Sequence, residues 1–546
     1  MGIAKAKTIR FTPKGLHDAW DSTDTFRGAC RILKDLIFDQ SNPELLACRP
    51  GVTALTTFGG FSSPGVISIF VAIGTRVYGM IATSRNAGKD EPFCYDTATM
   101  AFVTIGGTIT GATCPTTQST SGDWVPPTMA MIASKIIITH PGYPGTAGNM
   151  FGVIDVSNPA SPTYNIGDLA TNALPSLPVC VANFNNRAYF GCANAQVPFS
   201  DSLNPTTRTN ASQQLTIGNQ DQIQGMVGLP EQTASSGVIA ALIIFKRSET
   251  WQVTGDGTGI GNGTLALNYL SLNIGTLSPR TAVQSQSGVY FAGTSGPYYI
   301  NPLGAVIPLT HSPGDTEPDI QAPFQNCTMY SRACGNYEGT IWRVSLDTTI
   351  LGITARNDYW WDDHRRRWHG PHSFPYHCAD SINQFFVLAS NTFPGILFRS
   401  DTQANSTSVY NDNGTTISPV LQPATLPKDG TMTQKQVVES TIELAASGAS
   451  QAYVVTALDE LQNPLNQVVV NTLATALLWG GGALWGGGGL WTSSVALPKV
   501  YTIPWTTPLV FQKLALQVTT PASGALSIGT FYARYQDLGY TNTLPR

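Results

Sequence analysis

Residues 288–301 read Gly-Val-Tyr-Phe-Ala-Gly-Thr-Ser-Gly-Pro-Tyr-Tyr-Ile-Asn, and this stretch decides the fold class. Two short runs rich in strand-forming residues, 288–292 and 297–301, flank a turn cluster of Gly, Thr and Ser. Such a pattern predicts a β-hairpin. Similar runs of five to nine residues recur on both sides of it, from about residue 49 to residue 401. Strands are predicted at 66–73, 131–139, 179–184, 187–192, 238–245, 329–333 and 340–346, among others.

This series of hairpins predicts an all-β fold whose largest part, residues 51–401, is a β-propeller. About 350 residues of strands without intervening helices fit a propeller better than one sandwich. No strict sequence repeat is visible, so the blade number follows from length alone. At roughly 40–60 residues per blade, six or seven blades are expected, and six are favoured.

The two ends of the chain are expected to form separate parts. In residues 1–50, a helix over 21–40 would place Phe26, Cys30, Leu33 and Ile37 on one apolar stripe. Such a helical arm has to dock at an interface, either in its own chain or on a neighbouring subunit. Residues 402–430 have the composition of a connector, and strand patterns return after it. Residues 402–546 are therefore expected to form a C-terminal β-sandwich.

Composition excludes several classes of protein. Only 12% of the 546 residues are charged, about half of the usual fraction, which rules out a coiled coil or a helical bundle. A net charge of −4 argues against a protein that holds nucleic acid through a basic face. The longest apolar run, 238–245, is too short for a membrane span. Nine cysteines without a CxxC pair are expected to be buried free thiols, made in a reducing cytoplasm.

Four segments carry a family resemblance. The residues Leu16-His17-Asp18-Ala19-Trp20 and Cys48-Arg49-Pro50-Gly51 look like the N-terminal region of tail proteins from short-tailed bacteriophages. The segment Phe245-Lys246-Arg247-Ser248-Glu249-Thr250-Trp251 is similar to a blade strand of that group. The segment 287–299 resembles its Gly-Val-Tyr-Phe hairpin. The group is that of the tail nozzle proteins, also called tail tubular or packaged-DNA stabilisation proteins, and the likeness extends in order over most of the chain.

The resemblance implies a structural virion protein of the tail. Such a protein assembles as a homo-hexameric ring below the portal and its tail adaptor, next to a tail fibre or tailspike. The ring extends the DNA channel, helps to retain packaged DNA, and lets the duplex pass on infection. It would be synthesised in the host bacterial cytoplasm. The low charge of this chain agrees with a conduit, because a channel must not bind the DNA that moves through it.

Two segments are candidates for a site. In residues 362–378, four of the seven histidines surround Arg365, Arg366 and Arg367. Their spacing matches no familiar metal-ligand pattern, so a hairpin with a polar tip is the favoured interpretation over a metal site. The three arginines are candidates for polar contacts with an acidic neighbour or with DNA phosphates, although a run of three is usually a solvated turn. In residues 478–491, Trp479, Trp485 and Trp491 stand six residues apart among glycines, an even spacing that puts all three on one face of an extended strand. They are interpreted as a contact with a neighbouring subunit, a constriction of the channel, or a platform for sugars or bases, the first being favoured.

No catalytic residues, cofactor or metal are expected, and the protein is predicted not to be an enzyme. The glycine-rich segment 255–263 is followed by an alternating, strand-like run rather than a helix, so it does not match a phosphate-binding loop. The alternatives are a carbohydrate-binding propeller for receptor recognition and, third, a propeller hydrolase with a carboxylate pair from distant strands.

Overall fold

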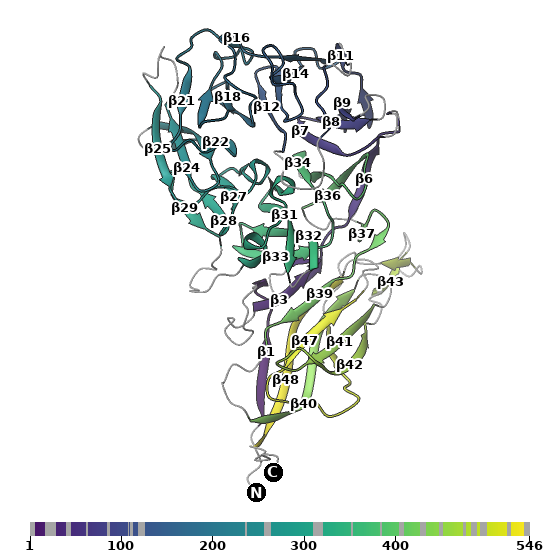
Figure 1. The fold of residues 1–546 in the computed structure, drawn as a ribbon. Coiled ribbons are helices and arrows are strands. Elements are labelled where there is room, and N and C mark those ends of the chain that lie inside the picture. Colours follow the sequence, from purple (N-terminus) through teal and green to yellow (C-terminus); the bar gives the residue numbers. More distant parts are fainter. Residues whose placement is uncertain are drawn as a thin grey trace.

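Nearly all of the regular secondary structure in the described part of the chain is strand (Figure 1). The described helical elements are short: α1 (Ala322–Gln325), η2 (Pro279–Thr281) and η3 (Tyr330–Arg332). None of them has the length or the apolar character needed to cross a membrane. The computed structural model describes residues 6–539 except for 17–28, 40–44, 60, 62–63, 84–87, 108, 110–112, 118–125, 235–236, 256–263, 310–319, 351–352, 383–384, 403–408, 426–432, 447–450, 473–476, 482–488, 492–498 and 521–525.

Five separate sheets form a five-blade β-propeller arrangement in the upper part of Figure 1. Each sheet starts with a strand at the centre and continues outward through antiparallel hairpins. The strands of each sheet are given from the centre outward. The first sheet contains β7 (Ile67–Ile73), β8 (Arg76–Thr83), β9 (Lys89–Asp96) and β10 (Ala101–Val103), and the second contains β12 (Thr128–Ile132), β13 (Lys135–Thr139), β14 (Phe151–Asp155) and β15 (Thr163–Gly167). The third contains β22 (Gly225–Ala234), β23 (Gly237–Phe245), β24 (Thr250–Thr254) and β25 (Ala266–Ser271), and the fourth contains β26 (Val283–Gln284), β27 (Val289–Gly293), β28 (Gly296–Ile300) and β29 (Val306–Pro308). The fifth contains β34 (Cys378–Ile382), β35 (Phe385–Ala389), β36 (Ile396–Asp401) and β6 (Val52–Thr57).

Two further groups of strands lie in the same circle. One joins β17 (Cys180–Phe184) and β18 (Arg187–Gly191) to the pair β19 (Gln196–Pro198) and β21 (Gln214–Thr216) through an isolated bridge. The other is β30 (Cys334–Glu338), β31 (Ile341–Ile350), β32 (Ile353–Asp362) and β33 (Arg367–His372). The strands β7, β12, β17, β22, β26, β30 and β34 contact one another in this order, and β34 contacts β7. The circle is therefore closed.

The ends of the propeller segment are held together by hydrogen bonds. Strand β6 precedes the first blade in sequence, yet it pairs antiparallel with β36 of the last sheet, from Val52 opposite Ser400 to Thr57 opposite Ile396. Because a strand from the start of the ring completes the sheet at its end, opening the ring requires breaking this ladder.

The hairpin predicted from residues 288–301 is confirmed. Strands β27 and β28 pair in register from Val289 opposite Ile300 to Gly293 opposite Gly296. All five residues of β27 are buried, because one of its faces packs on the neighbouring sheet of β22–β25 and the other on the sheet of β30–β33. On the second side the Tyr290 ring stacks against the Trp342 ring with centroids 5.5 Å apart.

The lower part of Figure 1 is a sandwich of two sheets that draws strands from both ends of the chain. Buried residues of both sheets belong to one hydrophobic core, which continues into the sheet of β30–β33. Sheet A contains β1 (Lys7–Phe11), β4 (Leu36–Phe38), β5 (Leu46–Cys48), β40 (Gln434–Ala446), β45 (Lys499–Thr502), β46 (Val510–Phe511) and β48 (Leu526–Gly539). Sheet B continues from β33 through β3 (Ala29–Lys34), β39 (Val420–Pro423), β47 (Ala515–Thr519), β41 (Ala452–Leu458) and β42 (Pro464–Asn471).

The helix predicted over residues 21–40 is wrong for the part that the structure describes. Residues 29–38 form β3 and β4, while Phe26 lies outside the described residues. Cys30 and Leu33 are fully buried as expected, but a register shift in β3 produces their odd spacing. A bulge inserts an extra residue into a strand, so residues three apart can face the same core and imitate a helical period. Ile37 is buried in β4, after a turn at Asp35 with φ 55°.

Three smaller expectations also change. Residues 330–332, predicted as a strand, form η3. The single strand predicted at 131–139 is divided into β12 and β13 by a tight turn in which Ala133 has φ 51°. Within the predicted connector, residues 420–423 form β39, which hydrogen-bonds to β3 on one side and β47 on the other.

Candidate functional site

The centre of the propeller contains a cavity of about 340 Å³. Its walls come from β7, β12, β17, β22, β30 and β34 and from the segment 279–284 that contains η2 and β26. Every group of strands in the circle therefore contributes to one space. A cavity of this size is at the lower end of the range that small molecules occupy in proteins.

Asp380 is the one carboxylate among the residues that line this cavity. It lies on β34, and its Oδ2 accepts a hydrogen bond of 2.6 Å from the backbone N–H of Ala72 on β7. Its Oδ1 accepts from the backbone N–H of Ser381 at 2.8 Å and from the side chain of Asn336 on β30 at 3.4 Å. The side chain keeps some accessible surface although protein surrounds it, because that surface faces the cavity.

Arg280 on η2 lines another part of the cavity wall. Its Nη1 donates to the carbonyl oxygens of Ser68 at 3.2 Å and His377 at 3.0 Å, and lies 2.8 Å from Sγ of Cys378. The guanidinium thus ties η2 to the adjoining strands β7 and β34. Sequence analysis missed both Arg280 and Asp380, since they are 100 residues apart and lie in no motif.

Two thiols in the cavity wall are poor nucleophiles. Burial raises the pKa of Cys378, although the nearby Arg280 charge partly opposes this shift. Burial also raises the pKa of Cys334, to about 12. Only the thiolate form attacks, so neither sulfur is activated at neutral pH.

Two of the three arginines predicted as a polar contact loop, Arg365 and Arg366, lie in the turn between β32 and β33, and Arg367 is the first residue of β33. The predicted pairing is confirmed, with Trp361 opposite Trp368 and Asp362 opposite Arg367. Arg365 forms an ion pair of 2.9 Å with Asp362 and donates to the carbonyl oxygen of Asp39 at 2.8 Å. Arg366 is exposed and has φ 53°. Arg365 therefore joins the hairpin to the N-terminal segment.

The histidines of this region do not converge on one point. The His369 ring packs on Phe38, and the His372 ring contacts the Trp360 ring edge-on. His377 Nε2 donates to the carbonyl oxygen of Ile67 at 2.7 Å. Burial lowers the pKa of His369 to about 4 and that of His372 and His377 well below the usual value. Among the described residues, no three His, Cys, Asp or Glu side chains are grouped as metal ligands would be.

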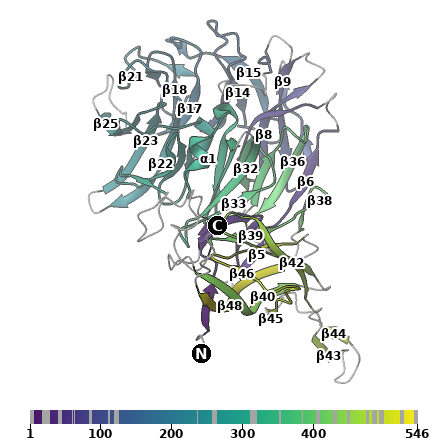
Figure 2. The ribbon, with the colours of Figure 1, turned by 60° about the horizontal axis from the view of Figure 1, so that its bottom comes forward.

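The Trp-Gly segment is only partly described. Trp479 lies in β43 (Leu477–Gly481) and Trp491 in β44 (Gly489–Trp491), while Trp485 lies outside the described residues. The two strands pair antiparallel as a separate two-stranded sheet, with Leu477 opposite Trp491 (Figure 2). Trp479 and Trp491 therefore lie on two antiparallel strands, so the expectation of one extended strand is wrong for these two residues.

One buried pair resembles part of a catalytic triad. His140 Nε2 lies 3.1 Å from Oδ2 of Asp90, and both side chains are fully buried. His140 Nδ1 accepts a hydrogen bond of 2.9 Å from the backbone N–H of Gly142. Both ring nitrogens are thus used, so this histidine has no position left from which to take a proton from a nucleophile. The pair holds the loop after β13 to β9.

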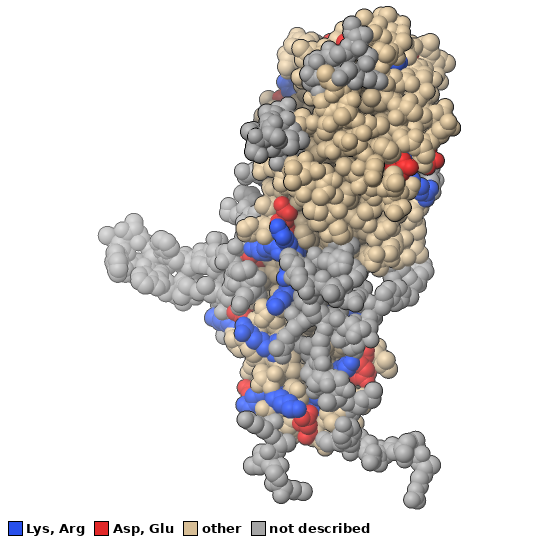
Figure 3. Space-filling model, turned by 90° about the vertical axis from the view of Figure 1, so that its left-hand side faces the viewer, with Lys and Arg blue, Asp and Glu red and all other residues tan. Residues whose placement is uncertain are grey.

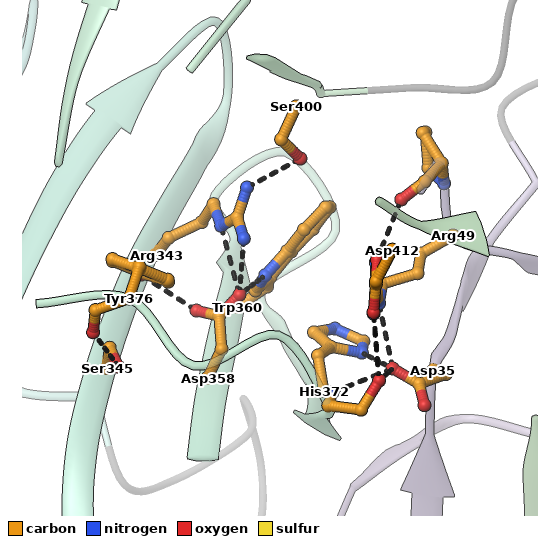
Figure 4. A network of polar contacts seen from close by, with 12 residues as sticks. Asp35, Arg49, Arg343, Ser345, Asp358, Trp360, His372, Tyr376, Ser400 and Asp412 are labelled. Carbon is orange, nitrogen blue, oxygen red and sulfur yellow. Dashed lines mark hydrogen bonds and ion pairs between the residues drawn. The ribbon is translucent and has the colours of Figure 1, made fainter. Parts of the chain in front are cut away.

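A second polar cluster joins the propeller to the sandwich (Figure 4). Arg49 is almost fully buried between Asp35 at 2.8 Å and Asp412 at 2.6 Å. Ser373 accepts a hydrogen bond from Arg49 and contacts both carboxylates. These residues come from the N-terminal segment, from the end of β33, and from β37 (Asn411–Asp412) beside β6. One guanidinium therefore fixes three distant segments at the joint.

A neighbouring network stabilises the adjoining sheet. Arg343 on β31 forms an ion pair of 2.5 Å with Asp358 on β32, and both are fully buried. Trp360 and Tyr376 each donate a hydrogen bond to the Asp358 carboxylate, at 2.7 and 2.8 Å (Figure 4). Burial raises the pKa of Asp358, and the charge of Arg343 is the largest effect in the opposite direction.

A substitution of Gly51, the last residue of the Cys48–Gly51 motif, tests how tightly the joint between the propeller and the sandwich is packed. A Cβ on Gly51 would lie 2.1 Å from the backbone oxygen of Asn411, so alanine requires the backbone to move. We expect Gly51→Ala to lower the free energy of unfolding by about 1–3 kcal/mol, measured by chemical denaturation. Gly59→Ala is the control, since its Cβ would meet nothing within 4 Å. Equal effects of the two substitutions would contradict the assignment of Gly51 to a close contact.

Comparisons with known proteins identify neither a family nor a curated relative: no protein-family model and no curated protein matches. Solved structures do match at low similarity. The computationally designed Ika8 protein is 11% identical, with a TM-score of 0.33, over 64% of this chain and 99% of that one. A puromycin hydrolase is 9% identical, with a TM-score of 0.37, over 70% of this chain and 64% of its own.

The WD40 β-propeller domain of Doa1 is also similar, at 8% identity and a TM-score of 0.25, over 50% of this chain and 92% of that domain. Likenesses at this level carry no information about activity or partners. The sheets themselves define the class of this chain, a nearly all-β protein with a β-propeller arrangement, to which a sandwich is joined.

Proposed function

We propose that this chain is a structural subunit of a short-tailed phage tail, a nozzle protein that forms a ring of six copies below the tail adaptor. In this proposal the ring continues the DNA channel, helps to retain packaged DNA, and contacts a tail fibre or tailspike. The resemblance of residues 245–251 and 287–299 to nozzle motifs supports it. Both segments lie in hairpins of the propeller, β23–β24 and β27–β28.

The observation that carries the proposal is the absence of charge from one part of sheet B. The four consecutive strands β39, β47, β41 and β42 contain no Asp, Glu, Lys or Arg, whereas β3 and β33 of the same sheet and the long strands β40 and β48 of sheet A contain charged residues. Charged residues are depleted in the cores of permanent interfaces, so these four strands have the composition of a surface that another subunit covers.

The outer face of sheet B also has the chemistry of a contact surface. A row of neutral polar side chains crosses four strands: Gln517 donates to Gln422, and Gln467 donates to Thr456. Gln467 and Gln517 keep accessible surface, whereas Gln422 and Thr456 are buried within the chain. At the edge of the sheet, β42 pairs only with β41 among the described residues and exposes Leu465 and Val469. Soluble proteins usually protect such edges with charged residues, because exposed strand edges associate.

The side of the propeller that faces the viewer in Figure 3 also has the composition of a subunit contact. It bears few charged side chains, whereas Lys, Arg, Asp and Glu gather over the lower part of the molecule. The outermost strand β25 contains no charged residue and exposes Leu267 and Tyr269. An extensive uncharged surface favours broad and lasting contacts between subunits.

The route for DNA in this proposal runs between the subunits rather than through the propeller. The central cavity, at about 340 Å³, has room for a small molecule and none for a duplex. Each chain carries a net charge of −4, so a ring of six would be strongly negative as a whole. Such a lumen would repel DNA and let it slide.

We also infer that the propeller has seven blades rather than the favoured six. The inference rests on treating the group β17, β18, β19 and β21 and the group β30–β33 as blades beside the five separate sheets. The bridge from Tyr189 to Phe199, which joins the two halves of the first group, supports this count. So does the closed circle of inner strands.

A charge placed on sheet B tests the proposed assembly. We expect Val469→Lys to fold normally but to raise the dissociation constant of the ring by at least about 100-fold. A buried, unpaired ammonium costs several kcal/mol at an interface. Native mass spectrometry measures the assembly, and thermal unfolding measures the fold.

The control is Val438→Lys, because Val438 on sheet A has the same exposed fraction as Val469, 51%. We expect the Val438→Lys variant to assemble like the unmodified protein. Rings that persist in the Val469→Lys variant, or that are lost equally in both, would contradict a subunit contact through sheet B.

A further inference from the structure

The carboxylate of Asp380 in the central cavity has more acceptor capacity than the protein uses. An ionised carboxylate offers about four acceptor positions. Three of them are filled by the backbone N–H groups of Ala72 and Ser381 and by the side chain of Asn336. All three donors are neutral groups. They fix the orientation of the carboxylate and leave its negative charge without a cation.

No ion pair to Asp380 occurs within the described part of the chain. The cation that shares the cavity wall, Arg280, is directed at Ser68, His377 and Cys378. A buried carboxylate without a counter-ion is costly, and proteins compensate such charges with a partner. The cavity supplies the space for that partner.

The rest of the wall mixes polar and apolar residues, with Thr128 on β12, Asn183 on β17 and Gln284 on β26 beside Ile69 and Phe70 on β7. Phe70 is the one aromatic residue of the lining, so the aromatic cage that binds quaternary ammonium ions is absent from the described cavity.

We propose that the central cavity binds a small primary alkylammonium ion, with its ammonium group on the Asp380 carboxylate. A primary ammonium donates up to three hydrogen bonds and can use the acceptor position that remains. The volume of about 340 Å³ accepts a short chain of this kind. This site does not depend on the proposed role in a phage tail.

The titration of Asp380 agrees with this geometry. Burial raises the pKa of Asp380 to about 6, the three hydrogen bonds oppose the shift, and the charge of Glu338 adds to it. A bound cation would favour the ionised form and bring this pKa back down. The proton and the ammonium ion therefore compete for the same carboxylate, and binding weakens as the pH falls below about 6.

The test uses n-butylammonium chloride as the probe and isothermal titration calorimetry of the full chain at pH 7.5. We expect saturable binding to the unmodified protein, and roughly 10–100-fold weaker binding to Asp380→Asn. Asparagine keeps the acceptor oxygen and removes the charge. The control is Asp168→Asn, because Asp168 also accepts backbone N–H groups, of Leu169 and Leu174, but lies outside the cavity lining. Butanol and sodium butyrate then replace the probe, to separate the contribution of the positive charge to binding from that of the carbon chain.

A second measurement needs no substitution. The carboxyl ¹³C resonance of Asp380, followed by NMR against pH, should show a lower pKa when butylammonium is present. Absence of saturable binding, equal binding to Asp380→Asn, or equal binding of butanol would overturn the proposal. So would a pKa of Asp380 that the probe leaves unchanged.

Discussion

Replacing Arg49 with methionine is expected to lower the free energy of unfolding by about 3–5 kcal/mol. Methionine has a similar length and no charge, so the substitution leaves Asp35 and Asp412 at the joint without their cation. The Arg49 and Asp35 side chains are each only 1% exposed, so water cannot replace the lost partner. Denaturation by urea, followed by circular dichroism, measures the change.

The control for this prediction is Arg31→Met, because Arg31 is an exposed arginine in β3 of the same N-terminal segment. A loss of stability that is no greater for Arg49→Met than for Arg31→Met would show that the buried cation does not hold the joint. The triple variant Arg49→Met, Asp35→Asn, Asp412→Asn removes the stranded charges. It is expected to recover part of the lost stability, since neutral amides cost less to bury than carboxylates.

Replacing Trp368 with alanine is expected to cost about 3–5 kcal/mol. The Trp368 side chain is fully buried in the core that continues from the propeller into the sandwich, with its ring centroid 5.8 Å from that of Trp342 and 5.4 Å from that of Trp361. Its Nε1 donates a hydrogen bond of 2.8 Å to the carbonyl oxygen of Leu309. Alanine leaves a cavity and also removes the donor from that buried carbonyl group.

The comparison for Trp368 is Trp505→Ala on the sandwich. Trp505 also donates a hydrogen bond, to Oγ of Ser440 at 2.7 Å, but its side chain is only partly buried. A smaller loss is expected for Trp505→Ala, because less apolar surface returns to water. If Trp505→Ala and Trp368→Ala lower the unfolding free energy equally, Trp368 is not the centre of a core shared by the two parts.

The strands of the propeller could be predicted because each is a local pattern. Residues 288–301 contain both strands and the turn of one hairpin, so alternation and turn residues suffice. The helix predicted for the N-terminal segment was wrong for the opposite reason. The burial of Cys30 and Leu33 depends on a bulge and on pairing with β39, which lies almost 400 residues further along the chain. A pattern read within twenty residues cannot contain that partner, and the helical period was the simpler local explanation.

The residues of the central cavity could not be predicted from the sequence. Asp380 gains its environment from Ala72 on β7 and Asn336 on β30, two strands that only the closure of the ring brings beside β34. The histidine-rich hairpin shows the converse case. Its pairing was predicted from neighbouring residues, and it is confirmed. Nothing in those residues indicated that Arg365 contacts the carbonyl group of Asp39, on the N-terminal segment.

The central claim, that this chain is a subunit of a six-membered ring, is tested most directly by its mass and shape in solution. Native mass spectrometry over a range of protein concentrations, together with electron microscopy of the same samples, gives both. The account predicts six-fold rings with an open lumen at high concentration, with a mass six times that of the chain. Particles with the mass of one chain at every concentration would contradict it.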